Sequence, residues 1–147
     1  MRNRISVRVA WALGVGGLVP FVVGAVSVWT LGPGGSGGLA SDALCDYGAC
    51  ILSFLGGIRW GADVRRGEEP NGIVLALSVL PSLTAWLATL TAHFTGYRWT
   101  FVLLIAAFAV QGAWDMRSAA LPDWMGRMRA LLTLGAVGSL MAALIAA

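Results

Sequence analysis

The chain has 147 residues, of which 58% are apolar and only 12% are charged, and its mean hydropathy is +0.78. Soluble domains carry about 25% charged residues, so this composition excludes a soluble globular domain. The net charge is +3, and all ten basic residues are arginines that are spread along the chain rather than gathered on one soluble face. The charge therefore gives no nucleic-acid-binding surface, and the arginine-only usage hints at a GC-rich bacterial genome.

Uncharged apolar runs of roughly 20 residues predict transmembrane helices. We predict an all-α integral membrane bundle in which residues 1–147 form one domain with five spans, at about 9–31, 42–61, 72–92, 97–114 and 128–146. Pro20 is expected to kink the first span, which is longer than a signal-peptide core and is expected to be retained. Pro81 lies in the third span, where the hydroxyls of Ser78 and Ser82 could satisfy backbone groups that proline frees.

The arginines predict the orientation of these spans, because positive residues near span ends favour the cytoplasm. With the N-terminus in the cytoplasm and the C-terminus in the periplasm, only Arg98 lies outside. We therefore expect a multi-pass protein of the bacterial inner membrane. We also expect inner-interface positions for Trp60, Trp114, Trp124, Arg127 and Arg129. The nine arginines on the cytoplasmic side are Arg2, Arg4, Arg8, Arg59, Arg65, Arg66, Arg117, Arg127 and Arg129.

The second span carries a small residue at every fourth position. Small residues let helix backbones approach closely in lipid, so this stripe is the predicted packing face of the helix. Ser41 or Asp42 is expected to cap the helix by accepting hydrogen bonds from its first free amides. The predicted packing face consists of Cys45, Ala49, Ser53, Gly57 and Gly61.

Charged residues stand at both ends of this second span. Asp42 and Asp46 lie near its outer end, where they could bind a cation, a proton or a basic residue of a partner, or could simply favour a helix N-terminus. Arg59 lies near the inner end and has three candidate partners: Asp63 one turn on, lipid phosphates, or a polar cluster on the fourth span. That cluster would join Arg59 to Gln111 and Asp115 and tie two helices together, which is the interpretation we favour.

Residue types that carry chemistry are sparse. His93 is the only histidine, and haem or zinc sites need more ligands, so we predict no metal site and no catalytic residue. Cys45 and Cys50 lack redox spacing and are interpreted as packing residues. No cofactor is predicted. A bound lipid or quinone is an open alternative, for which Tyr47, Ser53 and Trp60 could line a pocket or could be ordinary packing residues.

Several blocks of this sequence resemble one family of small bacterial membrane proteins, domain of unknown function 3429, to which the mitochondrial transmembrane protein 69 is related. The resemblance covers the chain from about Trp11 onward and implies an inner-membrane protein of bacteria or mitochondria, without implying an activity. Family members commonly have histidine near position 59, where this chain has Arg59. The resembling blocks are Tyr47-Gly48-Ala49, Ile51–Gly57, Arg59-Trp60-Gly61, Leu77–Leu83 with Trp86, Gln111 with Asp115, and Leu121-Pro122 with Trp124, Arg127, Arg129, Leu132 and Thr133.

Three functions remain as hypotheses. The first is a non-catalytic accessory, stabilising or assembly subunit that packs against a larger, energy-converting membrane complex, with membrane lipids as its other partners. The second is a small transporter or proton- or ion-linked carrier, which needs Asp46 or Asp115 near a midplane site. The third is a quinone-, pigment- or haem-binding protein. The sequence shows no soluble substrate and no nucleic acid as a partner.

Overall fold

The computed structural model describes residues 2–32, 34–65, 69–118 and 122–147, so Arg66 and Leu121 lie outside the described residues. Five helical segments among the described residues are long and apolar enough to cross a membrane, which confirms an all-α, multi-pass membrane protein. The first of these segments consists of two helices. The helices are α1 (Arg2–Gly16), α2 (Val19–Leu31), α3 (Gly35–Val64), α4 (Gly72–Thr95), α5 (Tyr97–Arg117) and α6 (Asp123–Ala146).

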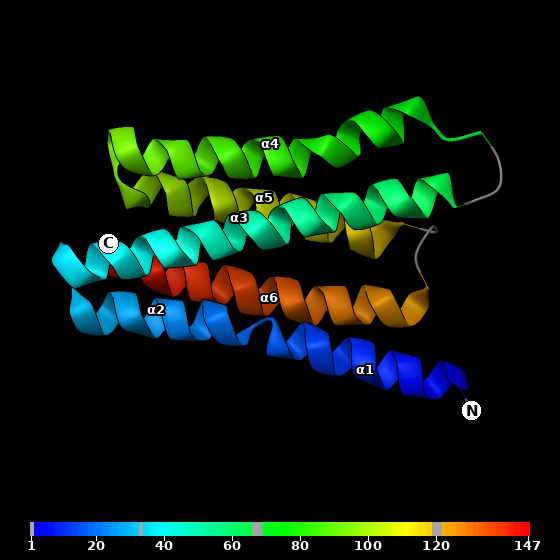
Figure 1. The fold of residues 1–147 in the computed structure, drawn as a ribbon, viewed down its shortest axis with the longest axis horizontal. Helices are drawn as coiled ribbons and strands as arrows, with labels where there is room; N and C mark the ends of the chain where they lie inside the picture. The colour runs from blue at the N-terminus through cyan, green and yellow to red at the C-terminus, as the bar shows by residue number, and fades with distance from the viewer. Residues whose placement is uncertain (1, 33, 66–68, 119–121) are drawn as a thin grey trace.

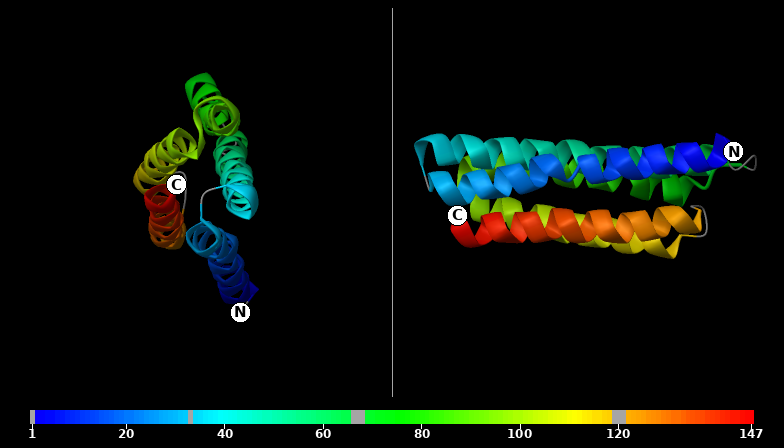
Figure 2. Two further views of the ribbon diagram at one scale, coloured as in Figure 1. Left: turned by 90° about the vertical axis from the view of Figure 1, so that its left-hand side faces the viewer. Right: turned by 90° about the horizontal axis from the view of Figure 1, so that it is seen from below.

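The helices lie side by side as an up-and-down bundle (Figure 1). Helix α3 packs against α2, α4 and α5, and α6 closes the bundle by packing against both α5 and α2. Figure 2 shows that α1 lies at the edge of this arrangement, and its main contact is with α6. The two chain ends lie at opposite ends of the bundle, which we call the N-end and the C-end.

The expected kink in the first span is a break between two helices. Helix α1 ends at Gly16, and α2 begins at Val19. Pro20 explains this position, because proline donates no backbone hydrogen bond and its ring would clash with the carbonyl of residue 16 in a continuous helix. The hydroxyl of Tyr47 on α3 donates a 2.8 Å hydrogen bond to the carbonyl of Gly17, so a side chain satisfies a backbone group that the break exposes.

Pro81, in contrast, leaves α4 uninterrupted. The hydroxyl of Ser78 donates to the carbonyl of Leu75 at 2.7 Å, and not to the carbonyl of Leu77 that Pro81 leaves without its helical partner, so the role expected for Ser78 is wrong. Ser78 and Pro81 are instead part of the small, buried face of α4. The buried residues of that face are Ser78, Pro81, Ala85 and Ala88.

Helix α3 begins earlier than the sequence predicts. The expected cap at Ser41 or Asp42 is wrong, because the helix starts at Gly35 and places both residues in its second turn. The chain reverses over Gly32 and Gly34, whose φ values of 67° and 95° favour glycine. Glycine lowers helix propensity, but here it permits the sharp turn and the close return of the chain, and packing outweighs propensity.

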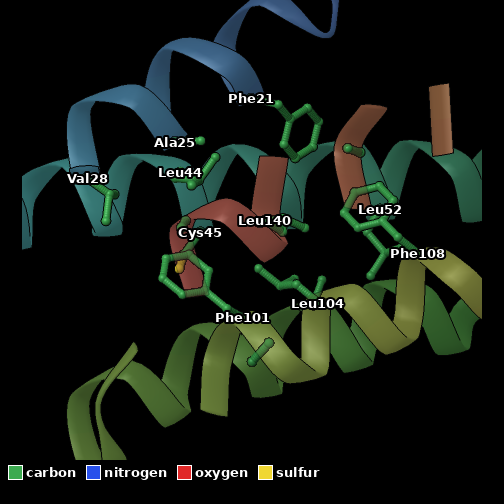
Figure 3. Close-up of a cluster of buried hydrophobic side chains, with 14 of the residues drawn as sticks. Phe21, Ala25, Val28, Leu44, Cys45, Leu52, Phe101, Leu104, Phe108 and Leu140 are labelled. Atoms are coloured by element: carbon green, nitrogen blue, oxygen red, sulfur yellow. The ribbon is translucent and has the colours of Figure 1, made fainter. Parts of the chain in front are cut away.

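The core is apolar and lies mainly between α2, α3, α5 and α6 (Figure 3), and Ala85 and Ala88 of α4 also belong to it. The ring of Phe21 on α2 contacts two other rings edge-on, with centroids 5.1 Å from Tyr47 and 5.6 Å from Phe108. Gly48 of α3 faces the same region, where a β-carbon would lie 3.4 Å from Leu104. This apolar middle separates two groups of polar residues, one at each end of the bundle.

Candidate functional site

The polar group at the N-end is built on the carboxylate of Asp115. Arg59 of α3 places its Nε 2.7 Å from Asp115 Oδ1, and Gln111 donates to the same oxygen through its Nε2 at 3.1 Å. Gln111 reaches Asp115 because residues four apart on a helix are neighbours on its surface. The structure thus brings together the three residues of the predicted polar cluster, and it links α3 to α5.

Arg129 of α6 also belongs to this cluster, with its Nε 3.6 Å from Asp115 Oδ2. Arg129 therefore faces the inside of the bundle, with only 6% of the residue exposed. The nearby Arg127 is exposed. A signal was present in the sequence: residues two apart on a helix do not share a face, so Arg127 and Arg129 could not both point toward lipid headgroups.

The predicted interfacial tryptophans have different surroundings. The ring of Trp114 lies 4.5 Å from the guanidinium carbon of Arg59, a cation–π contact that places it beside the cluster. Trp60 is 46% exposed on the outer surface of α3. Trp124 is half-buried and lines a cavity described below.

The cluster holds more positive than negative charge. Arg59 and Arg129 both lie against the single carboxylate of Asp115, and each of the three residues is at least nine-tenths buried. Two of their N–H groups, at Arg59 Nη2 and Arg129 Nε, have no hydrogen-bond partner. Asp63, one turn from Arg59, accepts a 2.8 Å hydrogen bond from the backbone N of Asn71, so its carboxylate fastens the start of α4 instead of pairing with Arg59.

The predicted packing face of α3 is only partly correct. Cys45 is buried, Ala49 and Ser53 are half-buried, and Gly57 is exposed. No neighbouring heavy atom lies within 4 Å of the position that a β-carbon would take at Gly57 or Gly61. A repeat of four residues advances about 40° around the helix at each step, so the stripe rotates out of the core.

A glycine outside the predicted stripe, Gly56, lies close against α4. A β-carbon there would overlap the backbone carbonyl of Ser78 and touch the ring of Pro81 at 3.5 Å. The buried face follows the 3.6-residue period of the helix, which is the signal that a strict four-residue spacing misses. The buried positions of α3 are Gly37, Ser41, Leu44, Cys45, Gly48, Leu52, Leu55, Gly56, Arg59 and Asp63.

The two acidic residues at the outer end of the second predicted span have different surroundings. Asp42 accepts a hydrogen bond from the hydroxyl of Tyr97 on α5 at 3.0 Å, which joins α3 and α5 at the C-end. Asp46 is exposed on the outer surface of α3, and His93 is exposed near the end of α4. Over residues 2–32, 34–65, 69–118 and 122–147, the structure gathers no group of three or more His, Cys, Asp or Glu that could hold a metal ion.

An apolar cavity of about 340 Å³ lies beside the cluster, between α1 and α2 on one side and α3, α5 and α6 on the other. Its lining includes Phe54, Met128 and Leu132, and among the described side chains Arg129 is the one charged residue that lines it. Tyr47, Ser53 and Trp60, the residues expected to line a lipid or quinone pocket, are not part of this lining.

These features define a class: a five-span helical membrane protein whose helices are tied at one end by a buried arginine–carboxylate cluster. The chain belongs to the family described as "Protein of unknown function (DUF3429)", whose family model matches residues 6–145. This match confirms the resemblance seen in the sequence.

A curated relative gives the same result. The chain is 35% identical over 139 residues to "Transmembrane protein 69" of Xenopus tropicalis. The aligned region covers 90% of this chain and 52% of that protein, so the chain spans about half the length of this relative. No solved structure matches the chain.

Proposed function

We propose that this protein is a non-catalytic accessory or assembly subunit that packs against a larger, energy-converting complex in the inner membrane of a bacterium. The observation that carries the proposal is the uncovered small-residue surface of α3. Gly57 and Gly61 lie one turn apart with open space above them, and the exposed side chains of Phe54 and Trp60 stand beside them. In lipid, helices associate by close packing at such Gly-x-x-x-Gly surfaces.

The position of the charged residues gives less support to a transporter. The buried charged residues among the described ones are Arg59, Asp63, Asp115 and Arg129, and all lie at the N-end of the bundle. Transport sites of secondary carriers lie near the middle of the membrane, where ionisable residues mark the path. The middle of this bundle is occupied by the apolar core.

The test of the proposed function is association in native membranes. Gly57→Leu combined with Gly61→Leu fills the open surface with side chains that touch nothing inside the bundle, so we expect the variant to fold but to lose its partner. Crosslinking mass spectrometry after gentle detergent extraction measures the association. Ala109→Leu, at an exposed position of α5, is the matched control and should keep the partner. Recovery of the wild type only as a free monomer, or only as a homodimer, would contradict the proposal.

We also propose that the N-end faces the cytoplasm. This orientation is supported by the exposed arginines Arg8, Arg65 and Arg117 at the N-end against Arg98 at the C-end. In a chain without its native cysteines, a cysteine introduced by His93→Cys should react with a membrane-impermeant thiol reagent on spheroplasts. One introduced by Glu69→Cys should react only after the membrane is broken. The reverse pattern would show the opposite orientation.

A further inference from the structure

The cavity and the cluster share one residue, Arg129. Only 6% of Arg129 is exposed, it lines the apolar cavity, and its Nε lies 3.6 Å from Asp115 Oδ2 without making a hydrogen bond. A buried N–H of a charged group that lacks a partner is costly, because its hydration is lost and nothing replaces it. Arg129 shares the one carboxylate of Asp115 with Arg59 and also lines the cavity, so an acceptor that enters the cavity can supply hydrogen bonds that the guanidinium lacks.

The charge balance shows what kind of acceptor fits. Asp115 supplies one negative charge to the two arginines Arg59 and Arg129. A second buried cation without a counter-charge is strongly unfavourable, so an anionic group stabilises this arrangement more than a neutral one. A quinone offers only neutral carbonyl oxygens and would leave the charge uncompensated, whereas a phosphate matches the donor geometry of a guanidinium and carries the missing charge.

The volume and the lining of the cavity indicate which group accompanies the phosphate in the ligand. Its volume of about 340 Å³ is within the range of about 300–1,000 Å³ typical of small-molecule sites, and its described lining is apolar apart from a few groups such as Arg129 and Thr133. Helix α1 forms one wall, and Figure 2 shows it lying apart from α3 at the edge of the bundle. An acyl chain is the apolar group that the surrounding membrane supplies at this position.

We infer that the cavity between α1, α3 and α6 binds an acyl chain of an anionic phospholipid whose phosphate pairs with Arg129. The inference does not rest on the proposed function, because the cavity lining does not include Gly57 or Gly61, although Phe54 borders both features. Asp115 contacts both Arg59 and Arg129, so a phosphate bound at Arg129 offsets the excess positive charge of the cluster.

Native mass spectrometry of the full chain in mild detergent tests this inference, with phosphatidylglycerol, phosphatidylcholine, inorganic phosphate and a long-chain quinone as probes. The wild type should bind phosphatidylglycerol at least about tenfold more tightly than phosphatidylcholine, because both lipids carry a phosphate but the choline cation of phosphatidylcholine cancels the negative charge that the two arginines need. Inorganic phosphate alone should bind poorly, because it leaves the apolar cavity unfilled.

Two variants and one control separate the headgroup from the tail. Arg129→Ala should weaken phosphatidylglycerol binding by about tenfold or more. The variant should remain folded, because Arg59 and Asp115 are left as a balanced pair. Ala10→Phe places a ring in the cavity and should weaken binding while all charges remain. Arg127→Ala removes an exposed arginine two residues from Arg129 and should leave binding unchanged.

Each contrary result overturns the inference. Equal retention of phosphatidylcholine would show that the net charge of the headgroup does not select the lipid, and unchanged phosphatidylglycerol binding by Arg129→Ala would show that the lipid is held without Arg129. Preferential binding of the quinone would assign the cavity to a neutral ligand, and tight binding of inorganic phosphate alone would remove the acyl chain from the site. Equal losses in Arg127→Ala and Arg129→Ala would indicate general attraction to a charged surface.

Discussion

Asp115→Asn is expected to destabilise the bundle by about 3–5 kcal/mol, the cost typical of removing one partner from a buried ion pair. The substitution keeps the shape of the side chain but leaves Arg59 and Arg129 without the negative charge that both of them contact. Detergent-induced unfolding of the purified protein, followed by tryptophan fluorescence, measures the loss. Asp46→Asn makes the same chemical change at an exposed position of α3 and should alter stability by less than about 0.5 kcal/mol.

A combined variant distinguishes the cost of an unpaired charge from the value of the ion pair itself. Replacing the three charged residues together, as Arg59→Met, Asp115→Leu and Arg129→Met, removes every charge of the cluster. We expect this triple variant to be more stable than Asp115→Asn, because apolar groups of similar volume often replace a buried ion pair at little cost. If Asp115→Asn behaved like Asp46→Asn, the cluster would not be what holds the N-end together.

Substitution by alanine of two adjacent glycines of α3 is expected to change the stability of the bundle in opposite directions. Gly56→Ala places a β-carbon against the carbonyl of Ser78 and the ring of Pro81, so α3 and α4 must move apart. Overpacking of this kind typically costs about 1–3 kcal/mol. Gly57→Ala places the same atom in open space and should stabilise the helix by about 0.5–1 kcal/mol, because alanine loses less backbone entropy than glycine.

The same unfolding assay measures both alanine variants, and each serves as the control of the other. They carry the same chemical change, one residue apart, on the same helix. A loss of stability in Gly57→Ala as large as that in Gly56→Ala would contradict the assignment of Gly57 to the open face of α3.

Much of the architecture could be predicted from the sequence, because the apolar runs and their lengths are properties of single segments. The contact between Arg59 and Asp115 was also accessible, since two opposite charges near the same predicted membrane surface have few other partners. The face of α3 that points inward was not, because small residues surround much of this helix and burial depends on neighbours that the sequence does not place. The inward position of Arg129 likewise depends on how α6 is rotated.

The ends of helices were predictable only where a local cause acts. Pro20 marks the break between α1 and α2 because its effect is confined to its own turn. The start of α3 at Gly35 depends instead on the chain folding back over Gly32 and Gly34. Contacts between distant segments, such as that of Tyr47 with Gly17, lie beyond what a local pattern contains.

The ion pair also determines an order of events during biosynthesis. Arg59 and Asp115 are 56 residues apart, and the whole of α4 is synthesised between them. Because the chain emerges from its N-terminus onward, Arg59 reaches the membrane before its counter-ion exists. An arginine without a partner is costly in hydrocarbon, so α3 is not fully satisfied until α5 arrives. Asp115 thus pairs with Arg59 only after α5 has been synthesised, and Arg129 of α6 contacts Asp115 last.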